Sequence, residues 1–442
     1  MKNLESTDEI LLEKRSKIKS ISIPTEEMCL EAVRQDGLTI QYIYMPTEEM
    51  CLEAIRQNGL AIRYICPSKK MCLEAVKQNG MAIQYILNPD EDVKLEAVGK
   101  DGNNIKYINN PSEVVSLKAI KQDSSAIKHI QNPSEKICLK SVKKHGSNIQ
   151  YIFKPSKAVC LEAVRQDGFA IQYIQNPSEE IQLEAVRKYG DSIRYIINPT
   201  ERVYLESVKE RASLQYISNP SEEVQLVGVK KHGSDIQYIS NPSKEVQLAA
   251  VRQDGFAIQY INNLSEEMCL EAVRQNGYSI QFISEPSELM CLEAVMNYGE
   301  SIQFISNPSM AVCLEAVRQD GFAIKYIDNP SELTCLMAIR RNIRSFFYIS
   351  NPSKTVCLEA VKGHPDIIQY INTQSEEVCM AAVKQNGLSI QYIFNPSEDV
   401  CMTAVKQNGL SIQFIRTPSE EVCMEAIKKN SSAIKYIVRV FK

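Results

Sequence analysis

Fourteen cysteines are the first residues to consider, because thiolates can form disulfides, bind zinc or act as nucleophiles. Thirteen of them share one position of a repeated pattern: Cys29, Cys51, Cys72, Cys138, Cys160, Cys269, Cys291, Cys313, Cys335, Cys357, Cys379, Cys401 and Cys423. On successive packed helices their sulfurs would stand about 9–10 Å apart. A disulfide needs Cα atoms within about 7 Å, and zinc needs sulfur at about 2.3 Å. We therefore interpret the row as buried, small apolar side chains.

The four histidines do not converge on one site either. His145, His232 and His364 occupy the same helix-end position of repeats that are four and six apart. A basic group there is explained by the negative end of the helix dipole. Catalysis needs an asymmetric group of nucleophile, base and oxyanion donors, and the chain contains no phosphate loop, metal motif or nucleophile elbow. We predict a protein that is not an enzyme and has no cofactor, metal site or small-molecule substrate.

A row of basic residues is the strongest candidate for a binding surface. With the proline of Asn-Pro-Ser as position 1 of each repeat, position 11 is Lys or Arg in seventeen of nineteen repeats. The candidate residues of this row are Arg34, Arg56, Arg165, Arg187, Arg252, Arg274 and Arg318. Such a row could follow a phosphate backbone, with Gln at position 18 and Tyr at position 19 supplying hydrogen bonds and stacking. Alternatively, the Glu common at position 8 pairs with the basic residue three places later.

One internal period organises nearly the whole chain. Seventeen of the eighteen prolines lie on a grid with a step of 22 residues, shortened to 21 twice, and Leu264 and Gln374 stand where the grid lacks proline. Isoleucine occupies position 20 in all nineteen repeats, and Tyr precedes it in fifteen. Because one short repeat cannot bury its apolar residues alone, the repeats must stack on one another.

Each repeat begins with the residue types of a helix start. Asn or Ser can cap the free N–H groups, Pro suits the first turn, and Glu favours the helix dipole. With Asn as the cap, the Glu three residues later suggests a capping box. About eleven residues on, a glycine such as Gly37 or Gly255 is expected to end the helix in the left-handed conformation. For the following Ser-Ile-Gln-Tyr-Ile we favour a short α- or 3₁₀-helix over a strand.

These elements predict an all-α fold, a right-handed α-solenoid of about nineteen helix–turn–short-helix repeats. Residues 1–23 are expected to form a degenerate capping repeat, residues 24–437 one continuous solenoid, and residues 438–442 a short tail. The net charge of −4 gives no general reason to expect an anionic partner. No apolar run approaches the roughly 18 residues that span a bilayer. We predict an intracellular, cytoplasmic protein without a membrane partner.

The pattern Val-Cys-Leu-Glu-Ala-Val-Arg-Gln-Asn-Gly-x-Ser-Ile-Gln-Tyr-Ile, found with small changes at residues 268–283 and 378–393, is similar to a known repeat. It resembles the short α-helical repeats of unknown function found in large DNA viruses and some bacteria, and more distantly HEAT-like and leucine-rich-variant repeats. The resemblance covers almost the entire chain. It implies an all-helical solenoid and a location in the host cytoplasm if the source is a virus, but no activity.

Positions that vary on a uniform frame are where a solenoid would carry recognition. Position 15 holds Phe169, Phe256, Tyr278 and Phe322 among other types, and position 21 varies equally. Drift at unconstrained surface sites explains the same variation. We predict a scaffold that binds a protein partner through one extended surface. The alternatives are a binder of single-stranded RNA or DNA along the basic row, and a structural or assembly component.

Overall fold

The computed structural model describes residues 24–440. It divides into two compact units that meet between Gly228 and Val229, and each unit is described by itself below. The predicted capping repeat, residues 1–23, lies outside the described residues.

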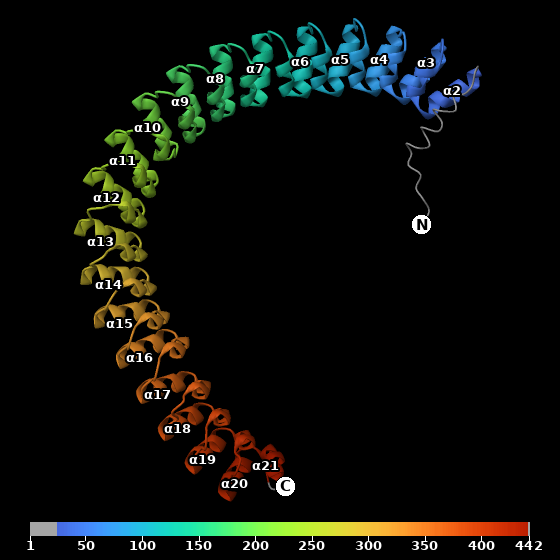
Figure 1. Cartoon of the computed structure of the whole chain (residues 1–442). Coiled ribbons are helices and arrows are strands. Elements are labelled where there is room, and N and C mark those ends of the chain that lie inside the picture. Colours follow the sequence, from blue (N-terminus) through green and yellow to red (C-terminus); the bar gives the residue numbers. More distant parts are fainter. Residues whose placement is uncertain (1–23, 441–442) are drawn as a thin grey trace. The chain divides into compact units, whose positions relative to one another are not determined.

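Each repeat consists of an α-helix, usually ten residues long, followed by a short 3₁₀-helix (Figure 1). In the first unit the α-helices are α2 (Glu26–Gln35), α3 (Glu48–Gln57), α4 (Lys69–Gln78), α5 (Glu91–Lys100), α6 (Glu113–Gln122), α7 (Glu135–Lys144), α8 (Lys157–Gln166), α9 (Glu179–Lys188) and α10 (Glu201–Lys209). The boundary between the units falls within α11 (Glu222–Lys231). In the second unit they are α12 (Lys244–Gln253), α13 (Glu266–Gln275), α14 (Glu288–Asn297), α15 (Met310–Gln319), α16 (Glu332–Arg341), α17 (Lys354–Gly363), α18 (Glu376–Gln385), α19 (Glu398–Gln407), α20 (Glu420–Lys429) and α21 (Ile434–Val440).

Most 3₁₀-helices begin after a one-residue break, whereas residues 210–213 separate α10 from η9. In the first unit they are η1 (Gly37–Tyr42), η2 (Gly59–Tyr64), η3 (Gly80–Tyr85), η4 (Gly102–Tyr107), η5 (Ser124–His129), η6 (Gly146–Tyr151), η7 (Gly168–Tyr173), η8 (Gly190–Tyr195) and η9 (Leu214–Tyr216). In the second unit they are η10 (Gly233–Tyr238), η11 (Gly255–Tyr260), η12 (Gly277–Phe282), η13 (Gly299–Phe304), η14 (Gly321–Tyr326), η15 (Ile343–Tyr348), η16 (Pro365–Tyr370), η17 (Gly387–Tyr392), η18 (Gly409–Phe414) and η19 (Ser431–Ala433).

Within each unit, successive α-helices lie side by side as one layer, and the 3₁₀-helices form a second layer against them (Figure 1). Residues 24–440 contain no strand. The prediction of an all-α solenoid is therefore confirmed, as is the short helix in place of a strand. The last repeat differs from the others, because α21 follows the three-residue η19 and continues into residues 438–440, which were expected to be a tail.

The start of the α-helices confirms Ser and corrects Asn among the two predicted caps. The usual cap is the Ser or Thr at position 2: the Thr25 hydroxyl accepts a hydrogen bond from the Met28 N–H at 3.3 Å, and Ser112 does the same for Val115 at 3.2 Å. The Asn before the proline instead takes a left-handed conformation, for example φ 49° at Asn88. A capping residue needs an extended backbone, so this Asn cannot serve. With Ser as the cap, the third helical residue is usually apolar, and no capping box with Glu forms among residues 24–440.

The end of each α-helix corrects the predicted role of glycine. No glycine among residues 24–440 has a positive φ. The helix usually ends at an extended Asp or Asn, with His145, Tyr189 or Tyr298 at this place in other repeats. Asp36 also starts the 3₁₀-helix by accepting a hydrogen bond from the Leu38 N–H at 3.0 Å. The glycine that follows is required for space. A Cβ atom on Gly37 would lie 2.3 Å from the carbonyl oxygen of Ala54 in the next repeat.

A glutamine at position 12 joins neighbouring repeats at the same place. The Gln78 side-chain oxygen accepts a hydrogen bond from the Gly59 N–H at 2.6 Å, and its amide donates to the Gln57 carbonyl at 3.3 Å. The Gly N–H to Gln bond, which we call the Gln clamp, recurs in the pairs Gly37–Gln57, Gly102–Gln122, Gly146–Gln166, Gly233–Gln253, Gly255–Gln275, Gly299–Gln319 and Gly387–Gln407.

The core lies between the two layers. In the repeat that starts at Pro46, Met50, Cys51, Ala54, Ile55 and Ile62 are all buried, with exposed fractions of 6% or less. The thirteen cysteines at this repeat position are likewise buried and free of disulfides, whereas Cys66 is exposed. The interpretation of the cysteine row as core packing is therefore confirmed.

We expect Gly387→Ala to destabilise the fold by about 1–3 kcal/mol, because the new Cβ atom would lie 2.4 Å from the Ala404 carbonyl oxygen. Gly363→Ala is the matched control, since nothing lies within 4 Å of its Cβ position and alanine favours the helix end. Urea unfolding followed by circular dichroism should show a lower midpoint for the first variant only. Equal midpoints would contradict the steric role of the glycine.

We expect a single fast-reacting thiol in the folded chain, that of Cys66. Burial, aided by the Glu398 carboxylate, raises the pKa of the Cys401 thiol to about 11, and burial raises the pKa of the other twelve row cysteines as well. A higher pKa leaves less reactive thiolate at pH 8. Titration with dithionitrobenzoate at that pH should lose its fast phase in Cys66→Ser, and several fast thiols would contradict the buried row.

Candidate interaction surfaces

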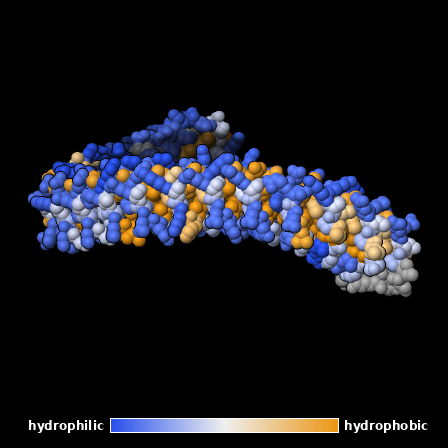
Figure 2. Space-filling view, turned by 90° about the horizontal axis from the view of Figure 1, so that it is seen from above, coloured by the Kyte–Doolittle hydropathy of each residue, from blue (hydrophilic) through white to orange (hydrophobic). Residues whose placement is uncertain are grey.

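Each repeat presents two different faces to solvent. The α layer exposes positions 4 and 11 and half-exposes positions 7 and 8, because positions 5, 6, 9 and 10 turn toward the 3₁₀ layer. The 3₁₀ layer exposes positions 18 and 21 and half-exposes position 19. A space-filling view shows narrow apolar stripes that alternate with hydrophilic ones along the stacked repeats, and no broad apolar patch on the face in view (Figure 2).

The predicted basic row lies on the α layer, and most of its candidate arginines are held by glutamates. Five pairs join an arginine to position 8 of the next repeat: Arg165–Glu184 at 3.1 Å, Arg187–Glu206 at 2.7 Å, Arg252–Glu271 at 3.3 Å, Arg274–Glu293 at 3.1 Å and Arg340–Glu359 at 2.7 Å. The pairs expected within one helix, three residues apart, also occur at Arg56–Glu53 and Arg318–Glu315. Arg34 is exposed.

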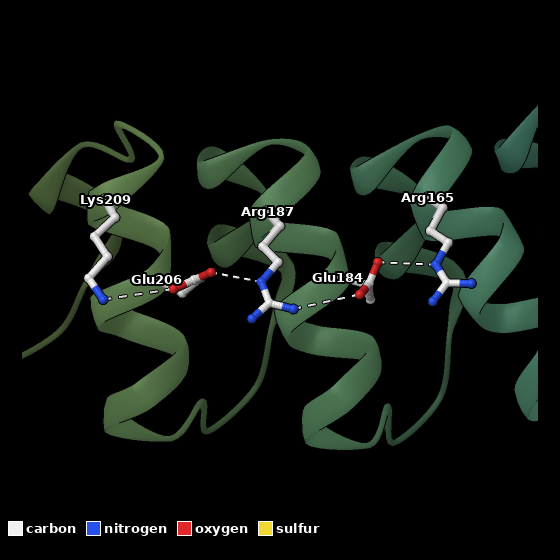
Figure 3. Close-up of polar contacts among 5 residues, drawn as sticks. All are labelled: Arg165, Glu184, Arg187, Glu206 and Lys209. Atoms are coloured by element: carbon white, nitrogen blue, oxygen red, sulfur yellow. Dashed lines mark hydrogen bonds and ion pairs between the residues drawn. The ribbon is translucent and has the colours of Figure 1, made fainter.

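The two kinds of pair combine into a continuous chain of alternating charge. Arg165, Glu184, Arg187, Glu206 and Lys209 follow one another across α8, α9 and α10 (Figure 3). The hydrogen bond from Arg187 lowers the pKa of the Glu206 carboxyl, so this carboxylate stays charged well into the acidic range. The basic residues of this stretch are therefore neutralised by carboxylates of their own fold. The sequence analysis predicted the ion pairs within helices and missed those between repeats. The pairs between repeats join an Arg to a Glu that lies 19 residues later in the chain.

The 3₁₀ layer carries a row of partly exposed aromatic rings at position 19, which we call the aromatic row. Eleven members are 37–55% exposed: Tyr42, Tyr85, Tyr151, Tyr173, Tyr195, Tyr238, Tyr260, Phe304, Tyr348, Tyr370 and Phe414. The other members are less exposed: Tyr64, Tyr107, Tyr216, Phe282, Tyr326, Tyr392 and Tyr436. The neighbouring residue at position 18 is usually Gln, whose amide donates to the chain, as Gln259 does to the Phe256 carbonyl at 3.0 Å. Position 18 is basic instead at Arg63, Lys106, Lys128, Arg194, Lys325 and Lys435.

The aromatic candidates of position 15 support this row. Each packs edge-on against the row residue of the next repeat: Phe169–Tyr195, Phe256–Phe282, Tyr278–Phe304 and Phe322–Tyr348, with ring centroids 5.9–6.2 Å apart. Their own rings are only half-exposed. These four residues are therefore placed to fix the orientation of the aromatic row, while presenting part of their surface beside it.

In several repeats, position 21 carries a large apolar side chain that is almost fully exposed to solvent. Tyr44, Leu87, Phe153, Ile197 and Phe394 are 80–93% exposed. They occupy the turn that leaves the 3₁₀-helix, directly before the Asn or equivalent residue with positive φ that redirects the chain. Because the turn holds them close to position 19 in the chain, they add apolar area at the same end of the 3₁₀ layer.

The basic row and the aromatic row do not form one surface. Position 11 lies on the solvent side of the α layer, whereas position 19 belongs to the 3₁₀ layer, and the buried core separates them. Among residues 24–440, no group of three or more His, Cys, Asp or Glu side chains is placed to hold a metal ion. No helix within that range is long and apolar enough to cross a bilayer.

We expect Arg187 and Glu206 to be energetically coupled by about 0.2–1 kcal/mol, the range of solvent-exposed ion pairs. Unfolding of Arg187→Ala, Glu206→Ala and the double variant should give this coupling energy, and it should fall as salt rises. The control pair Arg187 and Glu201 should show none, because Glu201 begins α10 and Glu206 lies more than one turn further on. Zero coupling for Arg187 and Glu206 would contradict the chain of paired charges.

Comparison with known proteins supports the repeat assignment. The family model described as a domain of unknown function, DUF4116, matches residues 25–68, 47–89, 68–111, 243–290, 353–396 and 397–438. These matches together span half of the chain and follow the repeat boundaries. No curated protein matches. The expected resemblance to a helical repeat family of unknown function is confirmed at this level, and the chain belongs to the DUF4116 family.

Proposed function

We propose that this chain is a non-catalytic repeat scaffold that binds a protein partner through the 3₁₀ layer. The observation that carries the proposal is the aromatic row, in which eleven repeats present a ring that is 37–55% exposed. Tyrosine and phenylalanine are enriched in protein interfaces, because each ring offers a large apolar area at a small cost in side-chain entropy. The exposed side chains of position 21, including Phe153 and Phe394, extend this area.

The α layer is less suited to this role. Its arginines already have carboxylate partners in Arg165–Glu184 and Arg187–Glu206, and a ligand would have to replace them. Exposed charged side chains are also depleted from the centre of interfaces. The rings of the aromatic row pack against neighbouring rings, as Tyr195 does against Phe169, and eleven of them remain 37–55% exposed. The fourteen free thiols agree with the reducing interior of a cell, where we propose that the scaffold acts.

The test begins with selection of random displayed peptides on the purified chain, followed by anisotropy of the selected sequences. Tyr238→Ala combined with Tyr260→Ala should weaken their binding at least about tenfold, which is about 1.4 kcal/mol. The matched control is Arg252→Gln combined with Arg274→Gln, on the α layer of the same region, which should change the affinity less than about twofold.

Three outcomes would contradict the proposal. The first is a selection that yields no binding peptide, and the second is a loss confined to the arginine variant. The third is tight binding of single-stranded RNA or DNA that falls steeply between about 50 and 200 mM salt, because stacking rings also take bases. That result would replace the proposal with the nucleic-acid function.

A further inference from the structure

A polar cleft of about 660 Å³ interrupts the 3₁₀ layer of the first unit. It lies beside the turns that lead into α6 and α7, and its lining includes Lys106, Ser116, His129 and Gln131. The cleft lies where two residues depart from the repeat. His129 replaces the Tyr or Phe of position 19, and Ser116 replaces the commonest residue of position 6, Cys. Both replacements are smaller than the usual side chain, so space opens between the turns.

The positive charge at this cleft comes from Lys106, which lines it at position 18, where Gln is the commonest residue. Lys128, at the same position of the next repeat, lies outside the lining. Position 18 is basic elsewhere at Arg63, Arg194, Lys325 and Lys435. Neither lysine has a carboxylate partner among the residues that the structure describes. By contrast, Lys325, at the same position in the second unit, is held by Glu300 at 2.8 Å.

The remaining groups complete a site for negative charge. The Lys106 amine lies 4.7 Å from the centre of the Tyr107 ring, which fixes it at the rim of the cleft. Glu113, the one acidic residue in the lining, is offset by Lys136 at 3.4 Å. Burial, together with Lys128 and Lys106, lowers the pKa of His129. Gln131 and Asn132 add side-chain amide donors. The cleft therefore combines unpaired positive charge with uncharged hydrogen-bond donors.

We propose that this cleft binds the carboxylate side chains of an acidic segment in the protein partner. The inference rests on the proposed function, since the segment would continue along the aromatic row on either side, over Tyr107 and Tyr151. Unpaired lysines near a partly enclosed polar space attract a carboxylate more strongly than lysines on an open surface. The site would favour an acidic segment over a neutral one, because the Lys106 amine lies at its rim.

The test uses two labelled ten-residue peptides, one alternating Glu and Tyr and one alternating Gln and Tyr, with the full chain in about 50 mM salt. The Glu peptide should bind at least about tenfold more tightly by anisotropy. In Lys106→Gln combined with His129→Tyr, this advantage should disappear while the Gln peptide is unaffected. These substitutions install the commonest residues of positions 18 and 19, so the fold should tolerate them, and circular dichroism verifies this.

Lys325→Gln is the control, because it removes a paired lysine from the same repeat position. It should leave both affinities unchanged. Equal binding of the Glu and Gln peptides to the unmodified chain would overturn the proposal for the cleft, as would an unchanged advantage in the double variant. Failure of both peptides to bind would overturn it as well. None of these outcomes bears on the proposed function, which is tested separately with the library-selected peptides and the Tyr238 and Tyr260 variants.

Discussion

The close approach of neighbouring repeats at the glycine of position 14 is the constraint on which the rest of the structure depends. Where the residue is glycine, its backbone lies so near the next helix that a Cβ atom would crowd it, as that of Gly146 would lie 2.4 Å from the Ala163 carbonyl oxygen. The same approach brings the glycine N–H within reach of a glutamine in the next repeat, at 2.6 Å for Gln166. A hydrogen bond to a buried backbone group is costly to leave unmade. Steric fit and hydrogen bonding therefore favour one spacing between repeats.

That spacing determines what each face can do. On the α layer, it brings position 11 of one repeat beside position 8 of the next, and the two charges neutralise each other across the seam. On the 3₁₀ layer, it brings position 15 against the ring at position 19 of the next repeat, so the aromatic row is ordered by packing rather than by its own conformation. On the α layer, the arginines of these pairs thus already have carboxylate partners, whereas the 3₁₀ layer keeps apolar surface exposed to solvent.

The repeats that lack the clamp show what it contributes. Ile343 and Pro365 stand where glycine is usual, and Pro365 has no N–H to donate. The repeat after Ile343 has Gly363 in place of the clamping glutamine, and a cleft of about 700 Å³ opens there between α16 and α17. The departures at Ser116 and His129 likewise coincide with a cleft. In a repeat protein, such local departures are the places where one part of the surface can differ from the next.

The sequence by itself determined the repeat, the all-α class, the short second helix and the burial of the cysteine row, because period and apolar pattern follow from how a helix exposes its faces. Only the tertiary structure decided which residue caps each helix, why glycine is needed, and which charges meet. Ser and Asn are both acceptable caps in isolation, and the left-handed turn at residues such as Asn88 settles the choice. From the sequence alone, Gly37 is expected to end the helix. Its steric role becomes visible only when the Ala54 carbonyl of the next repeat is known to lie beside it. Arg187 has two partners, Glu184 three residues earlier and Glu206 nineteen residues later. The second pair cannot be inferred from the sequence, because it depends on how neighbouring repeats stack.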